Sequence, residues 1–132
     1  MSFLLNRDMV VAYLRNVAPV VGRVAQHRGS LFLSAVTLMG LELWLLQVST
    51  PVRHAVRFQA MLQLFSVASI DEPVAHRAAS IGSKLRAQGR RLTTVELLVA
   101  GTAIERGWSL VTRSGSPLAG LPGLTVVDWS AP

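Results

Sequence analysis

Polar residues that could bind an anion are grouped in two places in the chain. Thr112-Arg113-Ser114-Gly115-Ser116 combines hydroxyls and a glycine, a composition whose backbone N–H groups can hold a phosphate. Short polar segments of this kind are also common as simple turns. The second group is basic and covers residues 84–91, with Arg86, Arg90 and Arg91. It indicates either phosphate contact or the solvated end of a helix.

Glu96 is the acidic residue with the most regular local pattern. It lies three residues after Thr93, the spacing of a capping box, in which the carboxylate accepts a hydrogen bond from the threonine N–H. The same carboxylate could also serve a functional site at the start of the helix. Both interpretations stay open at this point.

The composition excludes several classes of protein. Of the 132 residues 51% are hydrophobic and 15% charged, which excludes a disordered chain, and the length fits one domain over 1–132. Cysteine is absent, so disulfides, thiolate metal sites and a cysteine nucleophile are excluded. Thirteen basic against seven acidic residues give a net charge of +6, which suits RNA, DNA or an acidic partner.

No segment of the sequence resembles a signal peptide or a membrane span. The N-terminus has no basic leader, and the long apolar run over 31–48 contains Glu42 near its middle. We therefore expect a cytoplasmic protein with no membrane contact.

Apolar runs and helical periodicities alternate along the chain. Strands are predicted over 2–5, 31–33, 65–68, 108–112 and 124–127, and helices over 9–14, 19–27, 37–46, 52–64, 72–87 and 95–105. This order predicts a three-layer α/β/α sandwich with a mostly parallel sheet of four or five strands. The carboxyl ends of the strands would then form one crevice near residues 6–8, 37, 93–96 and 112–116.

Several segments resemble, in order, the motifs of PIN-domain proteins, and the closing ones resemble VapC-type toxins. They are FLLNRDMVVAYL over 3–14, SAVTLMGLE over 34–42, ELLVAGTA over 96–103, LVTR over 110–113, LPGL over 121–124 and VDW over 127–129. The resemblance implies an endoribonuclease that depends on Mg²⁺ or Mn²⁺ and is controlled by an antitoxin protein. Such chemistry needs several carboxylates around hard cations.

The acidic positions of the family carry mostly other residues here. They fall on Asn6, Gly40, Glu96 and Ser114, so that only Glu96 keeps a carboxylate in place. The family asparagine falls on Asp8, which could supply a shifted carboxylate or only favour the positive end of a helix. Pro117 stands at a further polar position of the family.

The resemblance therefore implies a degenerate VapC-like protein that binds RNA or a partner protein and holds no tightly bound cofactor. Arg86, Arg90, Arg91 and Arg113 are the predicted RNA contacts. The alternative is an active endoribonuclease with Mg²⁺ or Mn²⁺, in which Asp8 and Glu96 are the catalytic and metal-binding residues.

The helix over 37–46 suggests that the chain associates with other chains. Leu41, Trp44 and Leu45 indicate a face to be buried, and Trp44 is expected either in the core or at a dimer interface. We expect a homodimer and an antitoxin-like partner.

Overall fold

Five parallel strands form the central sheet of the computed structural model, which describes residues 1–118 and 120–131. The spatial order is β3-β2-β1-β4-β5, and each neighbouring pair is parallel. The strands are β1 (Phe3–Leu5), β2 (Leu31–Ser34), β3 (Ser66–Ala68), β4 (Ser109–Val111) and β5 (Val126–Val127).

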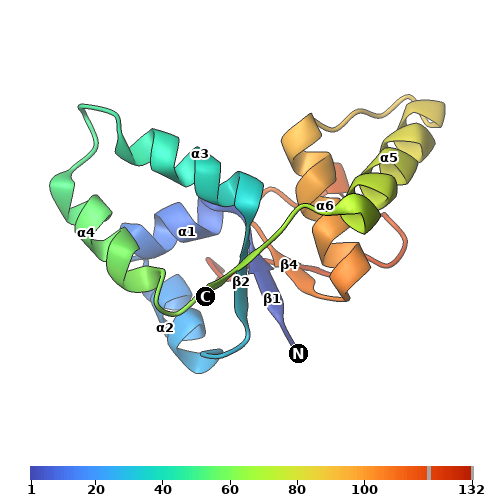
Figure 1. Ribbon diagram of the computed structural model, residues 1–132. Helices are drawn as coiled ribbons and strands as arrows, with labels where there is room; N and C mark the ends of the chain where they lie inside the picture. The colour runs from blue at the N-terminus through green and yellow to red at the C-terminus, as the bar shows by residue number, and fades with distance from the viewer. Residues whose placement is uncertain (119, 132) are drawn as a thin grey trace.

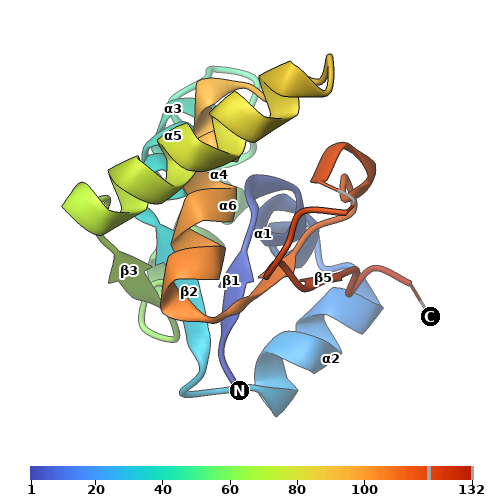
Figure 2. The ribbon, with the colours of Figure 1, turned by 90° about the vertical axis from the view of Figure 1, so that its right-hand side faces the viewer.

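Helices cover both faces of the sheet, as the sequence predicts. Helices α1 to α4 lie on one side in Figure 1, and α5 and α6 lie on the other. Figure 2 shows α5 crossing over α6 in front of the sheet. The helices are α1 (Arg7–Leu14), α2 (Ala18–Gln26), α3 (Ala35–Leu45), α4 (Val52–Met61), α5 (Glu72–Ala87) and α6 (Thr94–Arg106), with a short 3-10 helix at Ser116–Leu118.

The central strands β1 and β4 are buried along their whole length because each face of the sheet has its own core. Successive side chains of a strand point to opposite faces. Phe3 and Leu5 of β1 therefore pack with the α1–α4 layer, and Leu4 packs with α5 and α6. In β4, Val111 and Leu110 divide in the same way. Burial on both faces is typical of a parallel sheet.

Most helix ends lie within one residue of their predicted positions. Helices α1 and α3 each begin two residues earlier than predicted, and α4 ends at Met61 and not at Leu64. The start of α3 has a clear physical reason. Its N-cap is Ser34, whose hydroxyl accepts a hydrogen bond from the Val36 N–H at 3.3 Å. The predicted start, Thr37, is a buried residue inside the helix, with 3% exposure. Ser34 is also the last residue of β2, so the strand passes directly into the helix and leaves no loop for the sequence to reveal.

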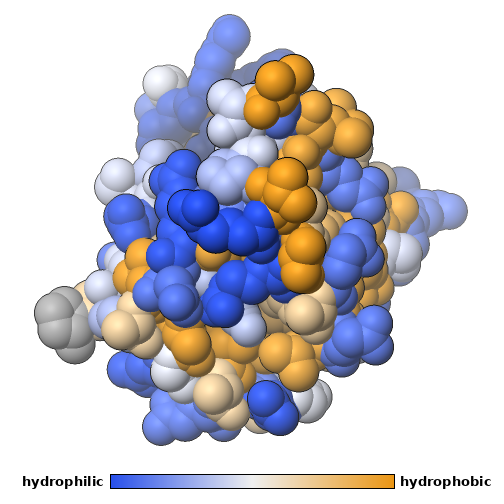
Figure 3. Space-filling view, turned by 90° about the vertical axis from the view of Figure 1, so that its left-hand side faces the viewer, coloured by the Kyte–Doolittle hydropathy of each residue, from blue (hydrophilic) through white to orange (hydrophobic). Residues whose placement is uncertain are grey.

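The face of α3 predicted to be buried, in the core or at a dimer interface, packs in the core of the chain. Leu41 is fully buried, and Trp44 and Leu45 pack against the same core. The large exposed apolar residues of α3 are Met39 and Leu43, and Leu46, the C-cap residue, is exposed as well. Figure 3 shows apolar side chains gathered in a band at this end of the molecule, beside strongly polar ones. Because α3 is apolar on nearly every side, periodicity could not identify its buried face.

Among residues 1–118 and 120–131, no helix is both long and apolar enough to cross a membrane.

Candidate functional site

The loops after β1 and β4 meet at the carboxyl end of the sheet. Leu5 and Val111 are register partners in neighbouring strands, and the Asn6 N–H donates to the Val111 carbonyl at 2.9 Å. The side chains that follow are consequently adjacent. The Asn6 amide donates to the Thr112 hydroxyl at 3.4 Å. The sequence prediction that these two loops share a crevice is confirmed.

The carboxylate of Asp8 binds three donors within the chain. One oxygen accepts the Met9 N–H at 2.8 Å, beside the start of α1. The other accepts the Thr112 hydroxyl at 3.0 Å and the Arg113 N–H at 2.8 Å. A carboxylate has about four lone-pair positions, so three of them are already used. The hydrogen bonds of Asp8 therefore join the loop after β4 to the start of α1.

A hollow of about 470 Å³ opens beside these loops, and we call it the crevice hollow. Three arginines and one aspartate give it a positive excess of charge. Its lining comprises Asn6, Arg7, Asp8, Val11, Ala12, Arg15, Val17, Arg113 and Ser114.

Helix α3 brings Gly40 next to Arg7, the first residue of α1. A Cβ atom added to Gly40 would lie 3.9 Å from Cδ of Arg7. The position on α3 where the PIN-domain motif has an acid thus faces the side chain of an arginine. Arg7 is exposed, and none of the described residues accepts a hydrogen bond from its guanidinium.

Glu96 forms the predicted capping box at the start of α6. Its carboxylate accepts the Thr93 N–H at 2.8 Å, and the Thr93 hydroxyl accepts the Glu96 N–H at 3.2 Å. Glu96 does not line the crevice hollow. Within the described part of the chain, no three His, Asp or Glu side chains lie close enough together to hold a metal ion.

The basic segment borders a second hollow, of about 540 Å³, between α5 and α6. Arg86, Arg90 and Arg91 line it together with the hydroxyl residues Ser83 and Thr94. The guanidinium of Arg90 also donates to the Pro117 carbonyl at 2.9 Å. The segment is therefore joined to the loop that follows β4.

Arg113 is held by the C-terminal segment, a contact between distant residues that no local sequence pattern indicates. Its Nε donates to the Ser130 hydroxyl at 3.1 Å, and that hydroxyl donates to Asp128 at 2.6 Å. The Ser130 side chain and N–H lower the pKa of Asp128, with a smaller contribution from Arg113. These residues are brought together by the pairing of β5 with β4.

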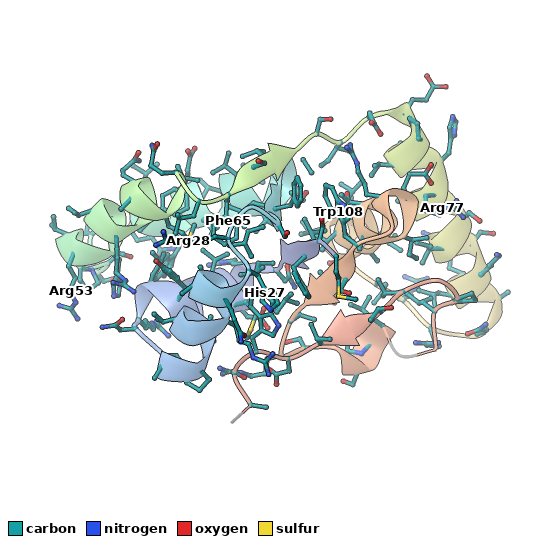
Figure 4. The ribbon with its side chains drawn as sticks, turned by 90° about the horizontal axis from the view of Figure 1, so that it is seen from below. His27, Arg28, Arg53, Phe65, Arg77 and Trp108 are labelled. Carbon is teal, nitrogen blue, oxygen red and sulfur yellow. The ribbon has the colours of Figure 1, made fainter. Side chains whose placement is uncertain are left out.

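His54 is a buried histidine, although the scattered spacing of the three histidines predicts surface or fully hydrogen-bonded positions. It is 6% exposed and stacks on Trp44, with 5.5 Å between ring centroids. Its Nδ1 has no hydrogen-bond partner among the residues that the structure describes. Burial lowers the pKa of His54, and the charges of Arg53, which projects from the outer end of α4 (Figure 4), and Arg15 lower it further. Its helical spacing to Phe58 and Met61, both buried, is the signal that could have revealed it.

The sequence of the chain was compared with protein-family models and with individual known proteins. No protein-family model matches the chain. It is 27% identical over 131 residues to the tRNA(fMet)-specific endonuclease VapC of Shigella flexneri, across 98% of this chain and 99% of that protein. It is 34% identical over 96 residues to ribonuclease VapC4 of Mycobacterium tuberculosis, across 71% of this chain and 73% of that one.

A solved structure shares the whole fold. The crystal structure of DNA-bound VapBC from Salmonella typhimurium matches with a TM-score of 0.88, covers 98% of both chains and is 22% identical in sequence. At 22% identity this similarity shows that the two proteins share a fold. The relationship in sequence is shown by the Mycobacterium ribonuclease, which is 34% identical. The chain belongs to the VapC family of PIN-domain ribonucleases.

Proposed function

We propose that this chain is a VapC-type protein that binds its partners without hydrolysing RNA. The main support for this proposal is the position of the Arg7 side chain beside Gly40. At the position on α3 where the PIN-domain motif has an acid, this helix has no side chain, and Cδ of Arg7 would lie 3.9 Å from an added Cβ atom.

The donor set does not fit an Mg²⁺ or Mn²⁺ centre. These cations take oxygen ligands, and Mg²⁺ gives up its bound water reluctantly, so several converging carboxylates are needed. Asn6 offers an uncharged amide, and Asp8 is hydrogen-bonded to three donors. The Glu96 carboxylate is bonded to its own helix start. The nearby guanidinium groups would repel a cation.

The proposed protein partner is an antitoxin-like chain. The Salmonella protein of the same fold is part of a VapBC complex. In this chain, α3 and α4 border a hollow of about 440 Å³ that includes Leu46 and Val56, and both residues are exposed. An apolar helix of a partner would cover this surface, which is part of the band in Figure 3.

RNA is the second ligand in the proposal. Arg86, Arg90 and Arg91 lie around one hollow, and Arg90 reaches the β4 loop that carries Arg113. Arginine forks bind phosphate oxygens in pairs, and several such contacts would hold a strand without cleaving it.

Metal titration tests the absence of catalysis. Calorimetry with Mn²⁺ and with Mg²⁺ is expected to show no stoichiometric micromolar site, and tRNA is expected to stay intact with millimolar amounts of either metal. The double variant Asn6→Asp with Gly40→Glu supplies two of the missing carboxylates and is expected to gain Mn²⁺ affinity. The control is Asn6→Asp with Gly22→Glu, which adds the same charge at an open position on α2.

The active-enzyme alternative makes the opposite prediction. Micromolar Mn²⁺ binding, with tRNA cleavage that EDTA and Glu96→Gln both abolish, would overturn the proposal. Glutamine still serves in a capping box, so Glu96→Gln removes the negative charge while the helix start stays capped.

A further inference from the structure

The crevice hollow has the charge of an anion site. We propose that it binds a phosphate monoester without a metal ion, either a mononucleotide or the phosphorylated end of a nucleic-acid strand. This inference rests on the proposed function, since a metal centre in the same place would need the opposite charge.

The charge of the hollow matches that of a monoester. Within the lining, Arg7, Arg15 and Arg113 carry three positive charges and Asp8 one negative charge, which leaves an excess of two. Asp128 lies outside the lining and accepts its hydrogen bonds from Ser130. A phosphate monoester carries about −1.5 to −2 at pH 7 and presents three terminal oxygens. A carboxylate or an internal phosphodiester carries a single negative charge and would leave one positive charge unbalanced.

Two of the three arginines are already positioned by groups outside the lining. Ser130 accepts a hydrogen bond from Nε of Arg113 at 3.1 Å, and Arg15 lies over the Trp44 ring, 5.9 Å from its centroid. In the described part of the chain, no acceptor binds the terminal Nη atoms of Arg7, Arg15 or Arg113. Their N–H donors are available to a ligand, and less side-chain freedom is lost when it binds.

Asp8 is turned toward the protein and not toward such a ligand. Its three donors all come from the chain, as described above. Ser114, which is exposed in the same lining, adds a hydroxyl donor. The hollow volume of about 470 Å³ lies in the range of small-molecule sites, so a phosphate with its attached sugar fits.

The test is calorimetric titration with inorganic phosphate and with adenosine monophosphate, in EDTA and at constant ionic strength. Both are expected to bind, and adenosine is expected not to. Arg7→Gln and Arg113→Gln are each expected to weaken binding by about 10-fold or more, as for the loss of a charged hydrogen bond. The control is Arg28→Gln, an equal loss of charge just before β2, at the amino end of the sheet (Figure 4).

The two sources of the phosphate are distinguished with a short RNA carrying or lacking a 5′ phosphate. Tighter binding of the phosphorylated strand than of the mononucleotide indicates a strand end, and equal affinities indicate the mononucleotide. Absence of phosphate binding, or equal weakening by Arg28→Gln, would overturn the inference, and so would preference for an acidic peptide over phosphate. Thermal melting of each variant checks that it is folded.

Failure of this inference can be separated from failure of the proposed function. Mn²⁺ is titrated into a second sample that contains neither EDTA nor phosphate. If neither Mn²⁺ nor phosphate binds, only the anion site is wrong. If Mn²⁺ binds at a micromolar site, the proposed function is wrong.

Discussion

Replacement of Gly40 should stabilise the protein, because nothing in the fold requires a glycine there. Gly40 lies in the interior of α3, and an added Cβ would meet only Cδ of Arg7, at an ordinary contact distance of 3.9 Å. Glycine in a helix interior costs about 0.5–1 kcal/mol relative to alanine. Gly40→Ala should therefore raise the free energy of unfolding by this amount, or the Tm by about 2–5 °C in a domain of this size.

Gly40→Glu should stabilise the protein further through Arg7. An exposed ion pair contributes about 0.2–1 kcal/mol, and this contribution should fall with added salt. Arg7→Met keeps the aliphatic packing and removes the charge, so a double-mutant cycle between Gly40→Glu and Arg7→Met isolates the pair.

Gly101 is the matched comparison, because it is also a glycine inside a helix but has no space for a Cβ atom. A Cβ there would lie 3.2 Å from the Ala78 nitrogen and the Val74 carbonyl oxygen, both backbone atoms of α5. Gly101→Ala should lower the Tm, because α5 and α6 would have to separate. Urea and thermal unfolding measure both variants. Two results would refute the placement of Arg7 against α3. One is a lower Tm for Gly40→Ala, and the other is zero coupling energy between Gly40→Glu and Arg7→Met at low salt.

Three further predictions concern stability and assembly. Thr93→Ala should cost about 0.5–2 kcal/mol by removing the cap of α6, whereas Thr94→Ala should cost much less; equal losses in urea unfolding would contradict the capping box. The folded-state pKa of His54 lies below the ordinary 6.5, so the unfolded chain takes up protons first and the free energy of unfolding should fall as pH drops below about 6.5. In His54→Phe this part of the pH dependence should disappear, and an unchanged pH profile would refute the assignment. Light scattering is expected to show a dimer, twice the chain mass of 14.3 kDa, and a monomer at high concentration would contradict the homodimer.

The elements of the fold could be predicted because their signals are local. Asp71 accepts a hydrogen bond from the Val74 N–H at the start of α5, three residues away. Gly107 ends α6 with a φ of 70°, a conformation that glycine adopts at no steric cost. The alternation of strands and helices along the chain then predicts a parallel sheet. The prediction was wrong where no local sequence pattern marks a boundary, as at the start of α3.

The partners within the site could not be predicted in the same way. The acceptor of the Thr112 hydroxyl is Asp8, 104 residues earlier, and the two are joined only because β1 and β4 are neighbours in register. The burial of His54 likewise depends on how α4 packs against the rest of its layer.

The sequence by itself determined which chemical groups the crevice can contain, because the identity of each residue is independent of folding. Asparagine and glycine stand at two of the acidic family positions, and arginine is abundant. Only the tertiary structure decided how these groups are used. It gave the Asp8 carboxylate three internal donors, laid Arg7 against Gly40 and collected three guanidinium groups around one hollow. The physical reason is that charges and hydrogen bonds act over a few ångströms in space, and sheet order and register set those distances.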